Sequence, residues 1–167
     1  MKCWPLFWLF IFIPSLSAPA WADQPLTLDW IDLVPENERN MFTPGGMPIQ
    51  PNVSHNSDMT AQQNRVGSVR GELNNSFVKI PGFVIPLEGD DKVVTEFLLV
   101  PYMGACIHVP PPPPNQIVYV KFKDGAPIQQ LWDVVYVMGT LKTEQVSHEL
   151  AEVGYLLEGE NLMPYDE

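Results

Sequence analysis

The sequence predicts a mainly β protein: a small five-stranded, OB-like barrel preceded by an N-terminal arm, with a β-sandwich as the alternative. Two observations lead to this prediction. After residue 67 the chain contains five apolar segments of strand length separated by loops and turns. Gly82 and Gly139 lie inside two of these segments, where strongly coiled strands need small residues.

The expected strands are rich in β-branched and aromatic residues. They cover residues 77–87, 93–100, 117–122, 131–141 and 155–163. The first is expected to bend at Pro81 and Gly82 and to form a hairpin with the second. Residues 144–152, between the last two strands, are expected to form a short helix or a loop.

The chain divides into three parts. Residues 1–22 are expected to be a signal peptide, residues 23–67 an N-terminal arm, and residues 68–167 the barrel domain. In the arm, Trp30, Ile31 and Leu33 are expected to pack on the core. The arm is otherwise rich in Pro, Gly, Asn and Ser, which are typical of loops, except for a short helix expected at residues 59–66.

The signal peptide has a positively charged start, an apolar stretch over residues 4–16 and an A-x-A cleavage site that ends at Ala22. Its apolar stretch is shorter than the roughly 20 residues of a transmembrane helix. Cys3 precedes that stretch, so it is not the lipid acceptor of a lipoprotein. We therefore expect secretion with cleavage after Ala22, and no transmembrane segment in the mature chain.

The chain is strongly acidic, with 9 Lys and Arg against 20 Asp and Glu and a formal net charge of −11. Removal of Lys2 with the signal peptide would change this charge to −12. An acidic surface disfavours nucleic acid, because phosphates need basic contacts. It suits cations or a basic partner.

Cys106 and His108 are the strongest candidates for a functional site. Cys106 would be the single cysteine of the mature chain. In an extended backbone, residues two apart point to the same side. A thiolate and an imidazole side by side suit zinc or copper. The five prolines at residues 110–114 restrict the backbone next to this Cys-x-His element.

Two ligands are too few for a closed tetrahedral zinc site. The other candidate ligands are acidic residues or histidines: Glu88, His55, His148, Asp90 and Asp91. We favour Glu88 as the third ligand because it ends the strand of the hairpin that leads into the Cys106 segment. Asp90 and Asp91 are expected to be ordinary turn residues, and His148 to face solvent.

Two functions without a metal remain open. In one, Cys106 is a buried apolar residue and the proline segment shapes the docking surface of an envelope interaction module. In the other, Cys106 is the nucleophile of a Cys-dependent enzyme.

Several segments resemble an uncharacterised family of proteobacterial periplasmic proteins and lipoproteins, defined only as a domain of unknown function. The similar segments cover residues 30–35, 81–88, 97–116 and 137–141. The most specific is the Cys-Ile-His-polyproline block. Members are often encoded beside a MacB-like ABC transporter and a histidine-rich, zinc-related periplasmic protein, so the resemblance implies a role near metal homeostasis or envelope transport. This chain lacks the lipobox cysteine of the lipoprotein members.

Taken together, these features predict a periplasmic, non-enzymatic accessory protein of an ABC-type transport system. We expect it to bind a transition metal through Cys106 and His108, with Glu88 as the third ligand. Zinc is the first choice, and copper or another divalent transition metal is the alternative. The expected partners are components of the transporter or a zinc-binding periplasmic protein.

Overall fold

The computed structural model describes residues 24–43, 47, 49, 63–64, 67–90, 92–105, 111–127 and 134–165. Within these ranges the chain forms short 3₁₀ helices and β-strands. In chain order these are β1 (Leu26–Thr27), η1 (Trp30–Leu33), η2 (Glu36–Met41), η3 (Gly71–Leu73), β2 (Ser76–Gly89), β3 (Val93–Val100), η4 (Pro114–Gln116), β4 (Val118–Pro127), β5 (Val135–Lys142), β6 (Val146–Ser147), β7 (Glu152–Val153) and β8 (Tyr155–Pro164). Of the helices in this part of the chain, none is long and apolar enough to cross a membrane.

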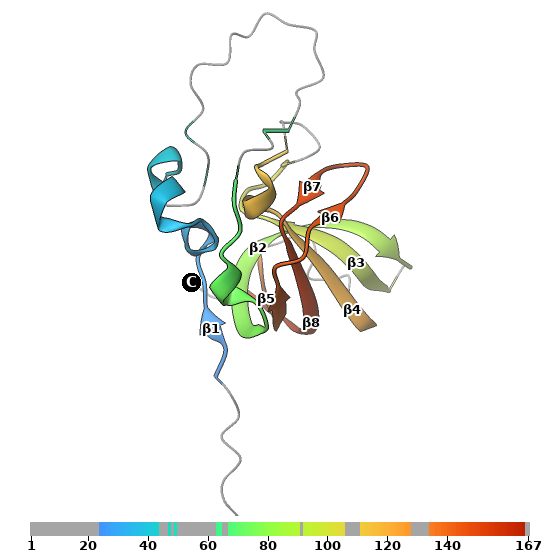
Figure 1. The fold of residues 1–167 in the computed structure, drawn as a ribbon. Coiled ribbons are helices and arrows are strands. Elements are labelled where there is room, and N and C mark those ends of the chain that lie inside the picture. Colours follow the sequence, from blue (N-terminus) through green and yellow to red (C-terminus); the bar gives the residue numbers. More distant parts are fainter. Residues whose placement is uncertain are drawn as a thin grey trace, which may run out of the picture.

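Five strands close into a barrel in the order β2-β3-β4-β8-β5, with β5 pairing back onto β2 (Figure 1). All neighbours are antiparallel except β4 and β8, which are parallel. This closed five-stranded arrangement confirms the predicted OB-like barrel. It also rules out the β-sandwich, because one continuous sheet closes on itself.

The long strand β2 takes part in both halves of the barrel. Its residues up to Gly82 pair with β5, and its residues from Phe83 onward pair with β3. A Cβ atom on Gly82 would lie 2.8 Å from Cγ of Leu99. The short strand β1 pairs with the first half of β2 at Val78 and Lys79. The predicted bend of the first strand is therefore the point where β2 changes partners.

Gly139 permits the close approach of β5 and β8. A Cβ atom at this position would lie 2.1 Å from the carbonyl oxygen of Glu158. The register of the β5–β8 pairing also shifts between Met138 and Gly139. A side chain here would push the two strands apart and open the barrel.

The apolar residues form two clusters, one inside the barrel and one outside it. Phe97 and Leu99 of β3 point into the barrel, while Leu98 and Val100 point outward into the second cluster. Because both of its faces are covered, residues 97–100 of β3 are fully buried. The buried members of this outer cluster are Ile85, Leu98, Val100, Ala105, Ile117, Tyr119, Ala151 and Val153.

Residues 144–152 differ from the expected helix or loop, since β6 and β7 form a small antiparallel hairpin. Val153 of β7 is buried in the outer cluster, and Val146 of β6 packs against it. This apolar contact favours an extended conformation that the local sequence did not indicate. In Figure 1 the hairpin lies at one edge of the barrel.

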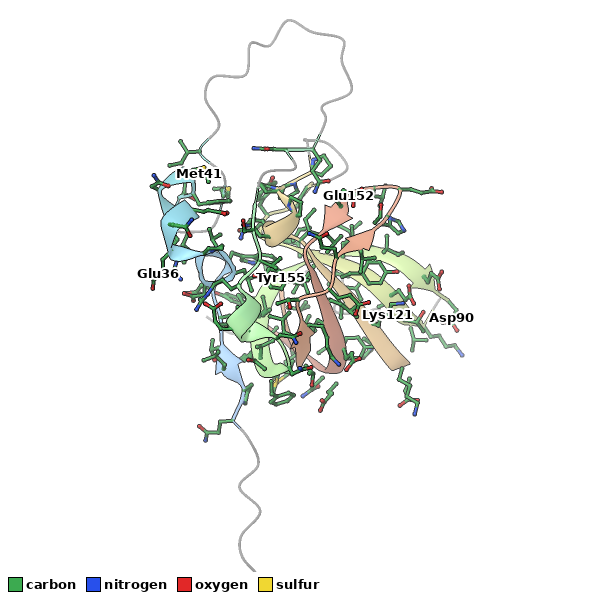
Figure 2. All side chains as sticks on the ribbon, viewed as in Figure 1. Glu36, Met41, Asp90, Lys121, Glu152 and Tyr155 are labelled. Atoms are coloured by element: carbon green, nitrogen blue, oxygen red, sulfur yellow. The ribbon has the colours of Figure 1, made fainter. Side chains whose placement is uncertain are left out.

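The arm packs along the barrel through η1. Of the three predicted core residues, Trp30 and Leu33 are buried, whereas Ile31 is only partly buried. Figure 2 shows Glu36 and Met41 of η2 on the opposite side of the molecule from Asp90 and Lys121. Of the helix expected at residues 59–66, Gln63 and Asn64 are described and are not helical. Its other residues lie outside the described ranges.

Gly139→Ala is expected to destabilise the barrel by about 1–3 kcal/mol, because the added methyl group overlaps a backbone carbonyl and separates β5 from β8. Gly71→Ala is the matched control, since a Cβ atom there meets nothing within 4 Å. Because both variants replace glycine with alanine, they lower the conformational entropy of the unfolded chain by the same amount. Urea unfolding curves would measure the difference, and equal stabilities of the two variants would contradict this account of Gly139.

Candidate functional site

Of the predicted site residues, the structure describes Glu88, Asp90 and His148. Cys106 and His108 lie outside the described residues, as do His55 and Asp91. Glu88 lies near the end of β2 and is exposed. The candidate site is therefore defined by the segments on either side of residues 106–110, namely residues 101–105 and 111–117.

The segment before Cys106 is anchored in the outer cluster. Val100 and Ala105 are both fully buried there. Tyr102 packs against the same cluster. Met103, in contrast, is 74% exposed. Cys106 therefore follows directly after a residue that packing holds in place.

The segment after His108 is also anchored. Pro112 and Pro113 are buried, and the backbone N–H of Gly154 donates a hydrogen bond to the carbonyl oxygen of Pro114 at 2.8 Å. Ile117, the next residue after η4, is fully buried in the outer cluster. Buried residues therefore flank residues 106–110 on both sides.

Two buried amide side chains at the end of the proline segment hold the neighbouring backbone. Nε2 of Gln116 donates hydrogen bonds to the carbonyl oxygens of Trp30 and Asn115, both at 2.9 Å. Nδ2 of Asn115 donates to the carbonyl oxygen of Ser68 at 3.1 Å. Sequence analysis did not single out these two residues. The one feature of the sequence that could have pointed to them is their position directly after the five prolines.

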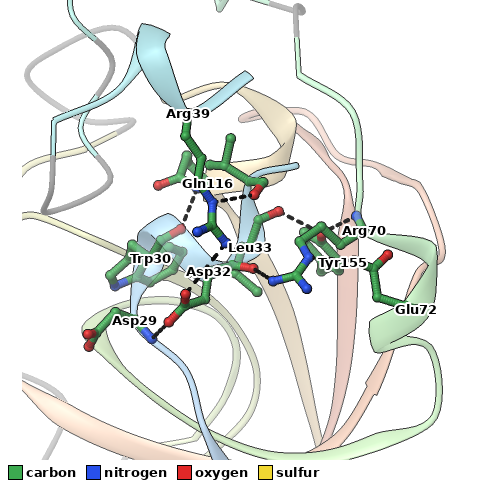
Figure 3. Close-up of polar contacts among 10 residues, drawn as sticks. Asp29, Trp30, Asp32, Leu33, Arg39, Arg70, Glu72, Gln116 and Tyr155 are labelled. Carbon is green, nitrogen blue, oxygen red and sulfur yellow. Dashed lines mark hydrogen bonds and ion pairs between the residues drawn. The ribbon is translucent and has the colours of Figure 1, made fainter. Parts of the chain in front are cut away.

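The arm is held on the barrel by a second set of contacts around Tyr155 (Figure 3). The Tyr155 hydroxyl group donates to the carbonyl oxygen of Leu33 at 2.8 Å and accepts from the N–H of Arg70 at 2.7 Å. Arginine side chains donate hydrogen bonds to the carbonyl groups on either side of Leu33. Nη1 of Arg70 donates to the carbonyl oxygen of Asp32 at 2.7 Å, and Nε of Arg39 donates to the carbonyl oxygen of Val34 at 3.2 Å. Three successive carbonyl groups are therefore satisfied by side chains, two of them from residues far away in the sequence.

Glu88 lies beside a polar cluster on the outer face of β3 and β4. It pairs directly across from Glu96 in the β2–β3 register. The Tyr119 hydroxyl group donates a short hydrogen bond to Oε2 of Glu96, and Nζ of Lys121 lies 3.2 Å from Oε1. The His148 ring lies 6.2 Å from the Tyr119 ring, centroid to centroid.

Glu88 is far from the point where the Cys106 segment leaves the barrel. Phe83, which pairs with Val100 at that point, is five residues away along β2. At about 3.3 Å per residue, this separation is roughly 16 Å. A metal ion shared by Glu88 and Cys106 would require the segment to run back along the hairpin.

The other candidate ligands have defined local roles. Oδ1 of Asp90 accepts hydrogen bonds from the N–H groups of Lys92 and Val93 at 2.8 and 2.9 Å, so Asp90 is a turn residue, as expected. These bonds lower its pKa. Nδ1 of His148 accepts from the N–H of Leu150 at 3.2 Å, which leaves Nε2 as its available nitrogen. The residues that the structure describes contain no group of three or more His, Cys, Asp and Glu side chains able to hold a metal ion.

Two tyrosines have raised pKa values. Burial, followed by the hydrogen bond to Glu96, raises the pKa of Tyr119 to about 12. Burial also raises the pKa of Tyr155 to about 12, although the Arg70 N–H opposes this shift. The Tyr119 hydrogen bond in turn lowers the pKa of Glu96.

Tyr155→Phe is expected to cost about 1–3 kcal/mol, because it leaves the buried Leu33 carbonyl without its donor and the Arg70 N–H without its acceptor. Tyr119→Phe is the matched control, since its partner Glu96 keeps Lys121 and contact with solvent. Limited proteolysis should cut the arm faster in Tyr155→Phe than in the control. Equal rates would show that this hydroxyl group does not hold the arm.

Stability is expected to fall as the pH rises from 10 to 12. The folded-state pKa values of Tyr119 and Tyr155 lie above the ordinary value of 10.0. Their contribution is therefore fully present below pH 10 and is lost as the pH rises through the folded pKa. Urea unfolding at several alkaline pH values would measure this loss. A double Tyr→Phe variant should show a smaller pH dependence.

Comparison with known proteins identifies the family. The model of the family described as "Protein of unknown function (DUF3299)" matches residues 30–164. The crystal structure of a DUF3299 family protein from Pseudomonas aeruginosa PAO1 is similar, with a TM-score of 0.70 and 39% sequence identity over 86% of this chain and 98% of that chain. No curated protein matches this chain. The chain therefore belongs to the DUF3299 family.

Proposed function

We propose that this chain is a periplasmic, non-enzymatic protein that binds a transition metal ion, zinc first, through Cys106 and His108. The observation that carries the proposal is the burial of the residues that flank residues 106–110. Ala105 is fully buried on one side, and Pro112 is buried on the other.

Fixed ends favour metal binding by this short segment. A chain segment whose two ends are already held in place has less conformational entropy to lose when it captures an ion. A thiolate and an imidazole are ligands that zinc prefers, and the acidic chain would raise the local concentration of cations. The proposal thus combines the chemistry of the two side chains with the restraint on their backbone.

The remaining coordination positions decide what such a site can do. Glu88 is the proposed third ligand: it is exposed, and it can share an ion with Cys106 only if the intervening segment runs back along the β2–β3 hairpin. Catalytic and transfer sites for zinc keep at least one position open, whereas structural sites are closed. An incomplete ligand set suits transfer of the ion to another protein. The resemblance noted in the sequence implies an ABC-type transporter or a zinc-binding periplasmic protein as that partner.

A metal-free interaction module is the second candidate. Met103, three residues before Cys106, is 74% exposed beside the anchored Ala105. An exposed methionine on a restrained loop is typical of a contact residue at an interface. In this case the loop would present Met103 to a partner, and Cys106 would bind no ion.

Zinc titration of the secreted protein would distinguish the two candidates. Wild type is expected to bind one equivalent, and Cys106→Ser and His108→Ala should each weaken binding at least tenfold, because each removes one direct ligand. His148→Ala is the matched control and should bind like wild type. Glu88→Gln tests the third ligand separately. Mass spectrometry of the same sample would show whether residues 1–22 are removed.

Unchanged zinc affinity in Cys106→Ser would refute direct coordination by the thiolate. If wild type binds no zinc at all, the interaction module becomes the better account. In that case Met103→Ser, compared with wild type in a pull-down from periplasmic extract, would show whether the exposed side chain contacts a partner.

A further inference from the structure

A pocket lined mainly by aromatic and proline rings lies where β2 changes partners, and its volume is about 240 Å³. Three of its described lining residues are aromatic: Trp30 of η1, Phe83 of β2 and Tyr165, which follows β8. Pro81 of β2 and Pro101, which follows β3, are among the others. Drug-sized ligands fill pockets of about 300–1,000 Å³, so this pocket suits a smaller molecule.

Two of the three aromatic rings are held by contacts that the fold provides. Nε1 of Trp30 donates a hydrogen bond to the carbonyl oxygen of Pro81 at 2.8 Å, which fixes the indole ring against β2. The ring of Tyr165 stacks on that of Tyr136, with 4.9 Å between the centroids. Tyr165 is still 41% exposed, so part of its ring is accessible to a ligand.

Polar groups contribute little to recognition in this pocket. The Pro81 carbonyl oxygen already accepts the Trp30 N–H, and neither Pro81 nor Pro101 has an N–H of its own. Among the lining residues that the structure describes, none is charged. A ligand that needs several hydrogen bonds would therefore give up its bonds to water without replacement. The pocket favours a molecule that binds through contact with rings.

The charge of the chain favours a cation over a neutral molecule. The formal net charge is −11, and Asp29, directly before Trp30, is exposed (Figure 3). Aromatic faces attract cations that lie within about 6 Å of the ring centroid. The chain already makes such a contact next to the pocket, because Nζ of Lys79 lies 3.8 Å from the centroid of the Tyr136 ring.

We propose that this pocket binds a small organic cation of the quaternary ammonium class, such as a trimethylammonium group. Such a cation carries no N–H, so it needs no hydrogen-bond acceptor, and its methyl groups suit apolar walls. The rings of Trp30, Phe83 and Tyr165 hold it. This inference does not rest on the proposed metal site.

The test compares choline with its neutral isostere, in which a tert-butyl group replaces the trimethylammonium group. NMR titrations of the secreted protein would follow the indole N–H signal of Trp30, with NaCl added to match the ionic strength. Choline should shift this signal and bind at least about fivefold more tightly than the isostere, because only the cation gains from the ring faces and the acidic chain. Equal affinities would overturn the proposal in favour of simple apolar binding. A Trp30 signal that choline does not shift would also overturn it.

Two variants of Tyr165 test the ring contact. Tyr165→Leu removes the ring and should weaken choline binding about fivefold. Tyr165→Phe is the matched control, since it keeps the ring, and it should bind choline within about twofold of wild type. Unchanged binding in Tyr165→Leu would contradict the contact with this ring. A proline-rich peptide that shifts the Trp30 signal where choline does not would overturn the proposal and identify a docking site for a partner chain.

Discussion

The buried hydroxyl group of Tyr155 is the contact on which the arrangement of the arm depends. It satisfies the carbonyl group of Leu33 and the N–H of Arg70 at once, at a position where water is excluded. Unpaired backbone groups at such a position would each cost about 1–3 kcal/mol. With the arm held there, the carbonyl group of Trp30 meets the side chain of Gln116. The end of the proline segment is therefore held by the arm.

The outer cluster gives the candidate loop its second support. An ordinary barrel strand buries one face, but β3 buries both faces at Leu98 and Leu99 because the β6–β7 hairpin covers the outside. Ala105 inserts into this outer cluster, so packing fixes one end of the loop while hydrogen bonds fix the other. Binding sites are often on loops that a rigid scaffold positions. Here the scaffold extends beyond the barrel to include the hairpin.

The barrel could be predicted from the sequence because its strands are encoded locally, by alternating apolar residues and by Gly82 and Gly139. The β6–β7 hairpin could not, since the contact of Val153 with the outer cluster decides its conformation. Gln63, Gln116 and Tyr155 were also missed. Their partners lie 49 to 122 residues away, apart from the Gln116 bond to Asn115, and an amide or a phenol gives no local sign of such a bond. The Cys-x-His element was evident from residue type alone, and its coordination stays a prediction.

A proline segment is stiff, but it also creates a need for hydrogen-bond donors, because its carbonyl groups accept while its nitrogen atoms cannot donate. The chain meets this need from outside the segment, through Gln63 of the arm and Gly154 next to β7. The predicted boundary at residue 67 therefore separates two parts of the sequence that share one set of contacts. A change in the path of the proline segment must break bonds to the arm and to the hairpin together. The arm, the hairpin and the prolines at residues 112–114 thus share one set of contacts, and the free energy of any movement of these prolines includes the cost of breaking these bonds.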